Sequence, residues 1–258
     1  MDLQLTGKVV VITGGAAGIG AACAAAFLQE GCQVAICGRN QEKLDAFKAS
    51  MVEAGYELFG CVADVANQQA LEEFAQQVYA KYGRIDIWVN NAGISHKTKL
   101  LEMAATDWDK VMDINLKSVF LGAQVAARYM RKGEGGVILN ASSYASVIPS
   151  AGGGAYAASK AAVSSLTRTL AAELAPYNIR VNGYIPGVIA TQMNSKRLAE
   201  QPGATLGQIA LNRAGDAKEV AAGLVFLASG AASYITGTDL EISGGKFAVQ
   251  IPGEPWEW

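Results

Sequence analysis

Three side chains that could carry out acid–base chemistry lie close together in the middle of the chain: Ser143, Tyr156 and Lys160. Tyr156 and Lys160 are four residues apart in a segment rich in helix formers, so both should lie on one helix face. Ser143 follows the apolar, strand-like run 137–141, thirteen residues before the tyrosine. A phenol has an ordinary pKa of about 10, and a neighbouring ammonium should lower that pKa. We therefore predict that Tyr156 exchanges a proton with a substrate oxygen, with Lys160 assisting.

A glycine-rich turn near the N-terminus joins a strand-like run to a helix-like run. Residues 8–13 are apolar and mostly β-branched, residues 14–20 contain four glycines, and residues 21–30 are rich in alanine. In this context bare N–H groups and a helix N-terminus can bind a pyrophosphate, which the missing side chains allow to approach. We predict a dinucleotide-binding turn that includes Gly14, Ala17, Gly18, Ile19 and Gly20.

The second strand-like run, residues 33–37, ends where the adenosine ribose of a dinucleotide should lie. An acidic residue there would bind both ribose hydroxyls and favour NAD. The sequence instead has Gly38 followed by Arg39, whose guanidinium can bind a 2′-phosphate with paired donors. We therefore predict NADP as the cofactor. NAD is the alternative, because Ala17 adds no second basic group to the glycine turn.

Taken together, these patterns resemble the classical short-chain dehydrogenase/reductase family over nearly the whole chain. The resemblance rests first on Ser143 and the Tyr-x-x-x-Lys motif at 156–160. Three further motifs support it: Thr-Gly-x-x-x-Gly-x-Gly at 13–20, Asn-Asn-Ala-Gly at 90–93 and Pro-Gly-x-Ile-x-Thr at 186–191. It implies that Ser143 orients the substrate oxygen, that Tyr156 transfers the proton and that Lys160 holds the nicotinamide ribose.

The resemblance also implies roles for further residues. Asp64, with Val65 beside it, would meet the adenine, although a helix-capping role for Asp64 is a competing interpretation. Asn115 would complete the catalytic set by disturbing its helix, so that a backbone carbonyl can hold a water near Lys160. The remaining cofactor contacts implied are Asn91, Ala92, Gly93, Ile189 and Thr191.

The strand-like runs are mostly continuous rather than alternating in hydrophobicity, and helix-like segments separate them. This pattern predicts an α/β fold, a Rossmann-like doubly wound parallel sheet with helices on both faces. We expect seven strands in the order 3-2-1-4-5-6-7 and one long helix over residues 107–131. We expect one domain, 1–245, with a flexible substrate lid at about 187–210. The aromatic tail 246–258 should pack on its own body or on a neighbouring subunit, with disorder as the alternative.

Composition narrows the functional classes. The chain has 258 residues, is 51% hydrophobic and carries a net charge of −2 with no basic block, which argues against nucleic acid or an anionic membrane surface as a partner. Neither a signal-peptide pattern nor an apolar run near eighteen residues is present, so we expect a cytoplasmic protein.

The four cysteines should be buried and reduced. His96 is the only histidine, and we predict no metal site and no catalytic role for it, but either no role or a place in the wall of the substrate site.

We predict an NADP-dependent oxidoreductase that interconverts a ketone and a secondary alcohol on a small hydroxylated substrate of sugar, polyol or keto-acid type. A slight preference for a hydroxylated or anionic molecule comes from five lid residues: Thr191, Gln192, Asn194, Ser195 and Lys196. One alternative is a 3-oxoacyl-[acyl-carrier-protein] reductase, for which a basic cluster of Arg128, Arg131 and Lys132 could bind the acidic carrier. The alternative of another class is a non-catalytic dinucleotide-binding regulator. The resemblance also implies a homotetramer.

Overall fold

Seven parallel strands form one sheet in the order β3-β2-β1-β4-β5-β6-β7. The computed structural model describes residues 3–257, so Met1, Asp2 and Trp258, the last a residue of the predicted tail, lie outside it. The strands are β1 Val9–Thr13, β2 Gln33–Gly38, β3 Phe59–Val62, β4 Ile87–Asn90, β5 Gly136–Ala141, β6 Ile179–Pro186 and β7 Asp239–Ile242. The predicted fold class and strand order are confirmed.

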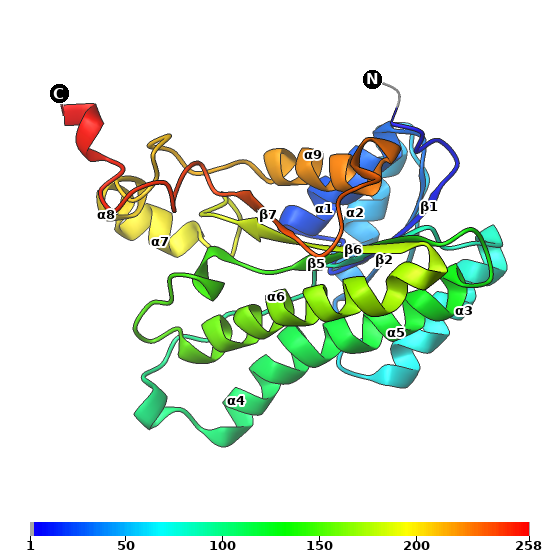
Figure 1. Ribbon diagram of the computed structural model, residues 1–258, viewed down its shortest axis with the longest axis horizontal. Coiled ribbons are helices and arrows are strands. Elements are labelled where there is room, and N and C mark those ends of the chain that lie inside the picture. The colour runs from blue at the N-terminus through cyan, green and yellow to red at the C-terminus, as the bar shows by residue number, and fades with distance from the viewer. Residues whose placement is uncertain (1–2, 258) are drawn as a thin grey trace.

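Helices cover both faces of the sheet, with α1, α2 and α9 on one side and α3, α5 and α6 on the other (Figure 1). Within residues 3–257 the α-helices are α1 Gly18–Gln29, α2 Gln41–Glu53, α3 Gln68–Tyr82, α4 Ala105–Met112, α5 Ser118–Met130, α6 Gly154–Leu174, α7 Ser195–Glu200, α8 Pro202–Leu206 and α9 Ala217–Ala228. None of the helices in this range has the length and apolarity that crossing a bilayer requires.

The central strands are buried on both faces, which explains their continuous apolar sequences. In β1, Val10 and Ile12 pack in the core beneath α1 and α9, while Val9 and Val11 pack in the core beneath α3 and α5. Successive side chains of a strand point to opposite faces, so a strand between two helical layers must be apolar at every position. Two hydrophobic cores therefore hold the carboxyl ends of β1, β4 and β5 in fixed positions.

The helix expected over 107–131 is interrupted at the place where the resemblance implied a disturbance, Asn115. The helical path is interrupted by a π-helical segment, Asp113–Lys117, between α4 and α5. The Ile114 carbonyl accepts a hydrogen bond from the Ser118 hydroxyl at 2.6 Å. A π segment adds one residue to a turn, and such insertions occur frequently at functional sites.

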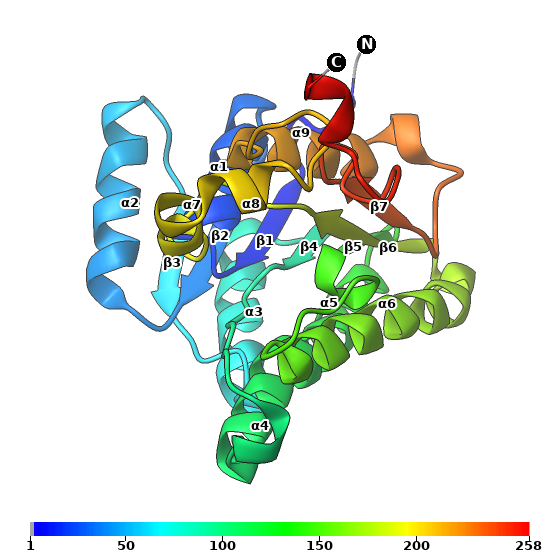
Figure 2. The ribbon, with the colours of Figure 1, turned by 90° about the vertical axis from the view of Figure 1, so that its left-hand side faces the viewer.

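The lid has more regular structure than we expected from its polar sequence. Helices α7 and α8 lie above the carboxyl ends of the strands, and the C-terminal segment lies beside them (Figure 2). The Trp256 indole N–H donates a hydrogen bond to the Ala210 carbonyl at 2.8 Å. Gly253 lies so close to Gly207 that a side chain at Gly253 would collide with the Gly207 carbonyl. The tail thus contacts the segment that follows α8.

Candidate active site

A cavity of about 480 Å³ opens at the carboxyl ends of the central strands. It lies where the strand order reverses between β1 and β4, the place where doubly wound sheets bind ligands. Nearly all of the predicted site residues line it, from the glycine turn at one end to the lid at the other. The two exceptions are Gly20 and Asn115, which lie behind its wall.

The glycine turn fits a dinucleotide pyrophosphate. Helix α1 begins with Ala17 as N-cap, which offers no capping side chain, and its first turn contains no acidic residue. In contrast, Asn40 and Asn67 cap the N-termini of α2 and α3 through their side chains. The first N–H groups of α1 therefore remain available for an anion at the positive end of the helix dipole.

Glycine is required in this turn for two different reasons. Gly14 and Gly18 have φ values of +65° and +54°, which other residues rarely adopt. Gly20 has an ordinary φ, but a Cβ atom there would overlap the Gly14 carbonyl oxygen. Gly20 thus allows α1 to pack on the turn and does not line the cavity, contrary to its predicted place among the cofactor contacts.

Asn91 ties the ends of three strands together at the floor of the cavity. Its Nδ2 donates to the Thr13 carbonyl at 3.0 Å, and its Oδ1 accepts a hydrogen bond from the Tyr184 hydroxyl at 3.2 Å. The Thr13 hydroxyl in turn accepts from the N–H groups of Asn91 and Ala92. Sequence reasoning missed Tyr184, which lines the cavity although its apolar strand gives no sign of it.

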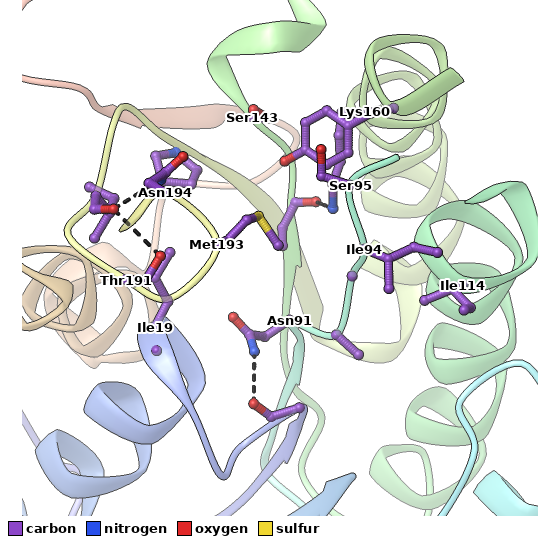
Figure 3. Close-up of a pocket in the computed structure, with 18 of the residues that line it drawn as sticks. Ile19, Asn91, Ile94, Ser95, Ile114, Ser143, Lys160, Thr191, Met193 and Asn194 are labelled. Carbon is purple, nitrogen blue, oxygen red and sulfur yellow. Dashed lines mark hydrogen bonds between the residues drawn. The ribbon is translucent and has the colours of Figure 1, made fainter. Parts of the chain in front are cut away.

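Ser143, Tyr156 and Lys160 meet as predicted from their spacing. Ser143 lies in extended backbone directly after β5, while Tyr156 and Lys160 lie one turn apart on α6. The Ser143 hydroxyl shares a hydrogen bond with the Tyr156 hydroxyl. The Lys160 ammonium lies 5.8 Å from the centre of the Tyr156 ring and donates to the Ala141 carbonyl at 2.7 Å. Figure 3 shows Ser143 and Lys160 on the same side of the cavity.

The pKa of Tyr156 differs from the sequence-based expectation. Burial raises this pKa above the ordinary value of the phenol, and the hydrogen bond from Ser143 offsets only part of that effect. Burial also lowers the pKa of Lys160 to about 8. The same desolvation that disfavours the phenolate disfavours the ammonium, so the lysine does not produce the expected net decrease in the tyrosine pKa.

Asn115 holds the cavity wall from behind. Its Oδ1 accepts a hydrogen bond from the Ile94 N–H at 2.8 Å, and its Nδ2 donates to the Ile94 carbonyl at 2.9 Å and to the Ser159 hydroxyl at 3.1 Å. Ser159 immediately precedes Lys160 on α6. The π segment thus directs one buried amide at both the loop after β4 and the helix that carries Tyr156 and Lys160.

The adenosine end of the cavity matches the prediction in part. Arg39 is exposed and lines the cavity, and it takes part in none of the ion pairs within residues 3–257. Gly38 beside it faces open space. Asp64 also lines the cavity and accepts a hydrogen bond from the Ala66 N–H at 3.0 Å. The cap of α3 is Asn67, so the capping interpretation of Asp64 is wrong.

The lid presents a different set of side chains from the one we expected. Thr191, Gln192 and Asn194 line the cavity, but Ser195 and Lys196 do not. Met193 and Arg197, which the sequence did not single out, line it instead, and Met193 extends from the lid toward the middle of the cavity in Figure 3. Helix α7 begins at Ser195, so its first residues face outward before Arg197 turns inward.

The remaining reactive side chains lie apart from the cavity. His96 does not line it, and its Nε2 lies 3.8 Å from the Asp107 carboxylate on the exposed side of the chain. The cysteines are free; three are buried and Cys61 is half-buried, so the prediction of four buried thiols is wrong for Cys61. Burial raises the pKa of the Cys23 and Cys32 thiols to about 12. In the described part of the chain no cluster of three potential ligands could hold a metal.

Comparison with known proteins decides the family. The family model for short chain dehydrogenases matches residues 8–202. The chain is a member of the classical short-chain dehydrogenase/reductase family. It is 41% identical to a 3-oxoacyl-[acyl-carrier-protein] reductase of Thermotoga maritima, over 94% of this chain and 99% of that protein. It is 40% identical to an NAD-dependent glycerol dehydrogenase of Listeria innocua, over 95% of each.

A solved structure extends the likeness to the whole fold. A short-chain type dehydrogenase/reductase from Mycobacterium marinum superposes with a TM-score of 0.92 at 36% identity, covering 96% of this chain and 99% of that one. Members of the short-chain dehydrogenase/reductase family bind NAD or NADP, and this chain is accordingly an NAD(P)-dependent oxidoreductase acting on CH–OH and C=O groups. The non-catalytic alternative is not retained, because the similar proteins are named dehydrogenases and reductases.

Proposed function

We propose that this short-chain dehydrogenase/reductase uses NADP to interconvert a ketone and a secondary alcohol on a small hydroxylated substrate of sugar, polyol or keto-acid type. The observation that carries the proposal is the meeting of Ser143, Tyr156 and Lys160 in one cavity with the uncapped N-terminus of α1. A site that binds a pyrophosphate at one end and polarises an oxygen at the other suits hydride transfer to a carbonyl.

In this proposal each side chain has one task. A bound nicotinamide dinucleotide supplies or accepts the hydride. Ser143 donates a hydrogen bond to the substrate oxygen and orients it, while Tyr156, raised in pKa by burial, donates its proton to that oxygen during reduction. Lys160 holds the ribose hydroxyls with the ammonium donors that Ala141 leaves free. Asn115 is a positioning residue that fixes Ile94 and Ser159.

The preference for NADP rests on Arg39. Its guanidinium lines the adenosine end of the cavity beside Gly38, which leaves room for a phosphate. Phosphate binds a guanidinium through two parallel hydrogen bonds, an arrangement that no other side chain provides. The remaining cofactor contacts would be those that line the cavity between Arg39 and the lid.

The second candidate is a 3-oxoacyl-[acyl-carrier-protein] reductase, which the Thermotoga relative favours. The basic cluster considered for carrier binding does not support it. Arg128 pairs with Glu72 at 3.4 Å, and the Arg131 guanidinium lies 4.0 Å from the centre of the Tyr177 ring. Arg128 lies in the last turn of α5, and Arg131 and Lys132 follow the helix just before β5 begins. The cluster therefore lies near the amino ends of the strands, opposite the cavity.

The domain and assembly follow as further parts of the proposal. Residues 1–245 would form one catalytic domain with the lid at about 187–210, and four copies would associate as in many family members. Helix α6 carries small residues that allow a second helix to approach closely. Light scattering on the purified protein should give a mass of four chains.

Substrate turnover tests the function directly. We expect NADPH oxidation with small keto-acids or keto-sugars, and no oxidation by Tyr156→Phe, which should still bind NADPH with an affinity within about threefold of the wild type. Tyr234→Phe, whose side chain is fully exposed, is the matched control and should keep full turnover. Retained turnover in Tyr156→Phe would remove Tyr156 from its role. A preference for 3-oxoacyl thioesters would select the second candidate.

A further inference from the structure

Arg197 reaches the cavity from the lid, and no carboxylate in the described part of the chain pairs with it. Its Nη1 donates a hydrogen bond to the Tyr144 hydroxyl at 2.8 Å, and its Nε donates to the Thr205 hydroxyl at 3.2 Å. The side chain is half-buried and lines the cavity. Both partners are neutral, so the guanidinium keeps its full positive charge and further donors for a ligand.

A second cation, Lys246, is buried next to the same tyrosine. Its side chain is 7% exposed, its ammonium lies 4.9 Å from the centre of the Tyr144 ring, and it donates to the Gln208 side-chain oxygen at 2.9 Å. Burial lowers the pKa of Lys246, and the nearby charge of Arg197 lowers it further. Two like charges held together at a partly buried site are unfavourable unless an anion joins them.

Some basic side chains of this chain do have an acidic partner, including one in the same helix as Arg197. Arg84 pairs with Asp86 at 2.6 Å and Arg213 with Glu219 at 2.7 Å, while Lys196, next to Arg197 in sequence, pairs with Glu200 at 3.8 Å. Over residues 3–257 neither Arg197 nor Lys246 makes an ion pair. Arg197 and Lys246 are thus cations without an acidic partner within that range, as Arg39 is at the other end of the cavity.

The cations lie at the substrate end of the cavity. Arg197 and Lys246 both contact Tyr144, which directly follows Ser143 in the chain. Lys97 adds another basic side chain to the cavity lining. Among the lining residues of the described chain the only acid is Asp64, which lies with Arg39 at the adenosine end. The field near the reacting oxygen is thus positive.

We propose that the substrate carries a carboxylate, which Arg197 binds, so that the enzyme acts on a small keto acid and its hydroxy acid. Lys246 is a positioning residue that holds Tyr144 and strengthens the positive field from behind. This inference rests on the proposed function and narrows its substrate class from sugars, polyols and keto acids to acids. A guanidinium can bind a carboxylate with two parallel hydrogen bonds and rejects a neutral analogue that leaves those donors unpaired.

The test compares matched acids and amides. Short keto acids, with the ketone two, three or four carbons along the chain, are assayed with NADPH beside their primary amides, which have the same shape without the charge. We expect the wild type to prefer at least one acid over its amide by about 30-fold or more in kcat/KM. Arg197→Gln should lose about 30-fold on the acid and at most about threefold on the amide.

Control variants separate charge from folding. Lys196→Gln removes the same charge from the same helix but from an exposed, paired side chain, and it should leave the acid preference unchanged. Lys246→Gln should reduce the acid preference, and Lys246→Arg should restore it, with thermal unfolding confirming that each variant folds. Equal wild-type turnover of acids and amides would overturn the carboxylate site while leaving the oxidoreductase intact. No turnover of any ketone would instead overturn the proposed function.

Discussion

At the level of single residues, the site depends on charges held away from water. Lys160 is buried, no carboxylate of residues 3–257 pairs with it, and desolvation lowers its pKa to about 8. Its ammonium donates to one carbonyl, that of Ala141. A group in this state destabilises the free protein, and ligand oxygens placed against it would stabilise both the complex and the charged form. Binding of the nicotinamide ribose should therefore raise the pKa of Lys160 again.

The pH dependence of unfolding tests the burial of Lys160. Its pKa is depressed from 10.5 to about 8 in the folded state, so the unfolded chain binds the extra proton between these values. Stability from this group is present above pH 10.5 and is lost as pH falls through 8. Relative to Lys160→Met, the wild type should thus gain about 1.4 kcal/mol in unfolding free energy per pH unit above 8, measured by urea unfolding. A pH-independent difference would show that the ammonium is hydrated.

Arg39 should set the cofactor preference. Arg39→Ala should raise the KM for NADPH by about 30-fold, because a charge-assisted pair of hydrogen bonds to the phosphate is lost, and change the KM for NADH by no more than about threefold. Lys48→Ala changes the net charge equally on α2 but does not line the cavity, so it should change neither KM. An equal change in the KM for NADPH and for NADH would show that Arg39 does not recognise the 2′-phosphate and acts only through its overall charge.

At the level of elements, the sequence predicted the helices and strands that have a clear hydrophobic pattern over their whole length. Strand β1, over the apolar run 8–13, and helix α1, over the alanine-rich run 21–30, follow directly from such patterns. The apolar pattern alone does not show the π segment, because one inserted residue leaves that pattern nearly unchanged. The resemblance, through Asn115, indicated where the helix is disturbed. Helices α7 and α8 have six and five residues, too few for a periodicity. For the same reason the sequence could not show that Arg197, and not Lys196, faces the cavity.

The π segment gives a prediction of its own. Asn115→Ala should lower the free energy of unfolding by roughly 2–4 kcal/mol, because it leaves the partly buried N–H and carbonyl of Ile94 without their side-chain partner and removes one of the two hydrogen bonds of the Ser159 hydroxyl. It should also lower kcat more than it raises the KM for NADPH, since Lys160 follows Ser159 on α6. Asp113→Asn, in the same segment, removes only an exposed pair with Lys117 and should cost less than about 0.5 kcal/mol. Equal losses of unfolding free energy in the two variants would show that the Asn115 hydrogen bonds do not stabilise the fold.

At the level of the whole molecule, the topology brings distant motifs together. The glycine turn after β1, the asparagine motif after β4 and Ser143 after β5 all follow neighbouring strands of one parallel sheet, so they meet at one edge. This much of the site could be predicted, since each motif stands at a strand end. The contact of the C-terminal segment with the lid could not be predicted, because it depends on the path by which the chain returns to the lid after β7.

Removing the end of that segment should therefore loosen the lid without emptying the cofactor site. Truncation after Gln250 deletes the Trp256 hydrogen bond to Ala210 and the close contact of Gly253 with Gly207, but keeps Lys246. We expect faster amide hydrogen exchange in residues 201–211 and a severalfold higher KM for the ketone, with the affinity for NADPH within about twofold of the wild type. Trp256→Phe keeps a ring and loses only the N–H donor, so its exchange rates and its KM for the ketone should lie between those of the wild type and of the truncated protein. Unchanged exchange in the truncated protein would mean that α7 and α8 hold the lid by themselves, and that the tail serves another contact.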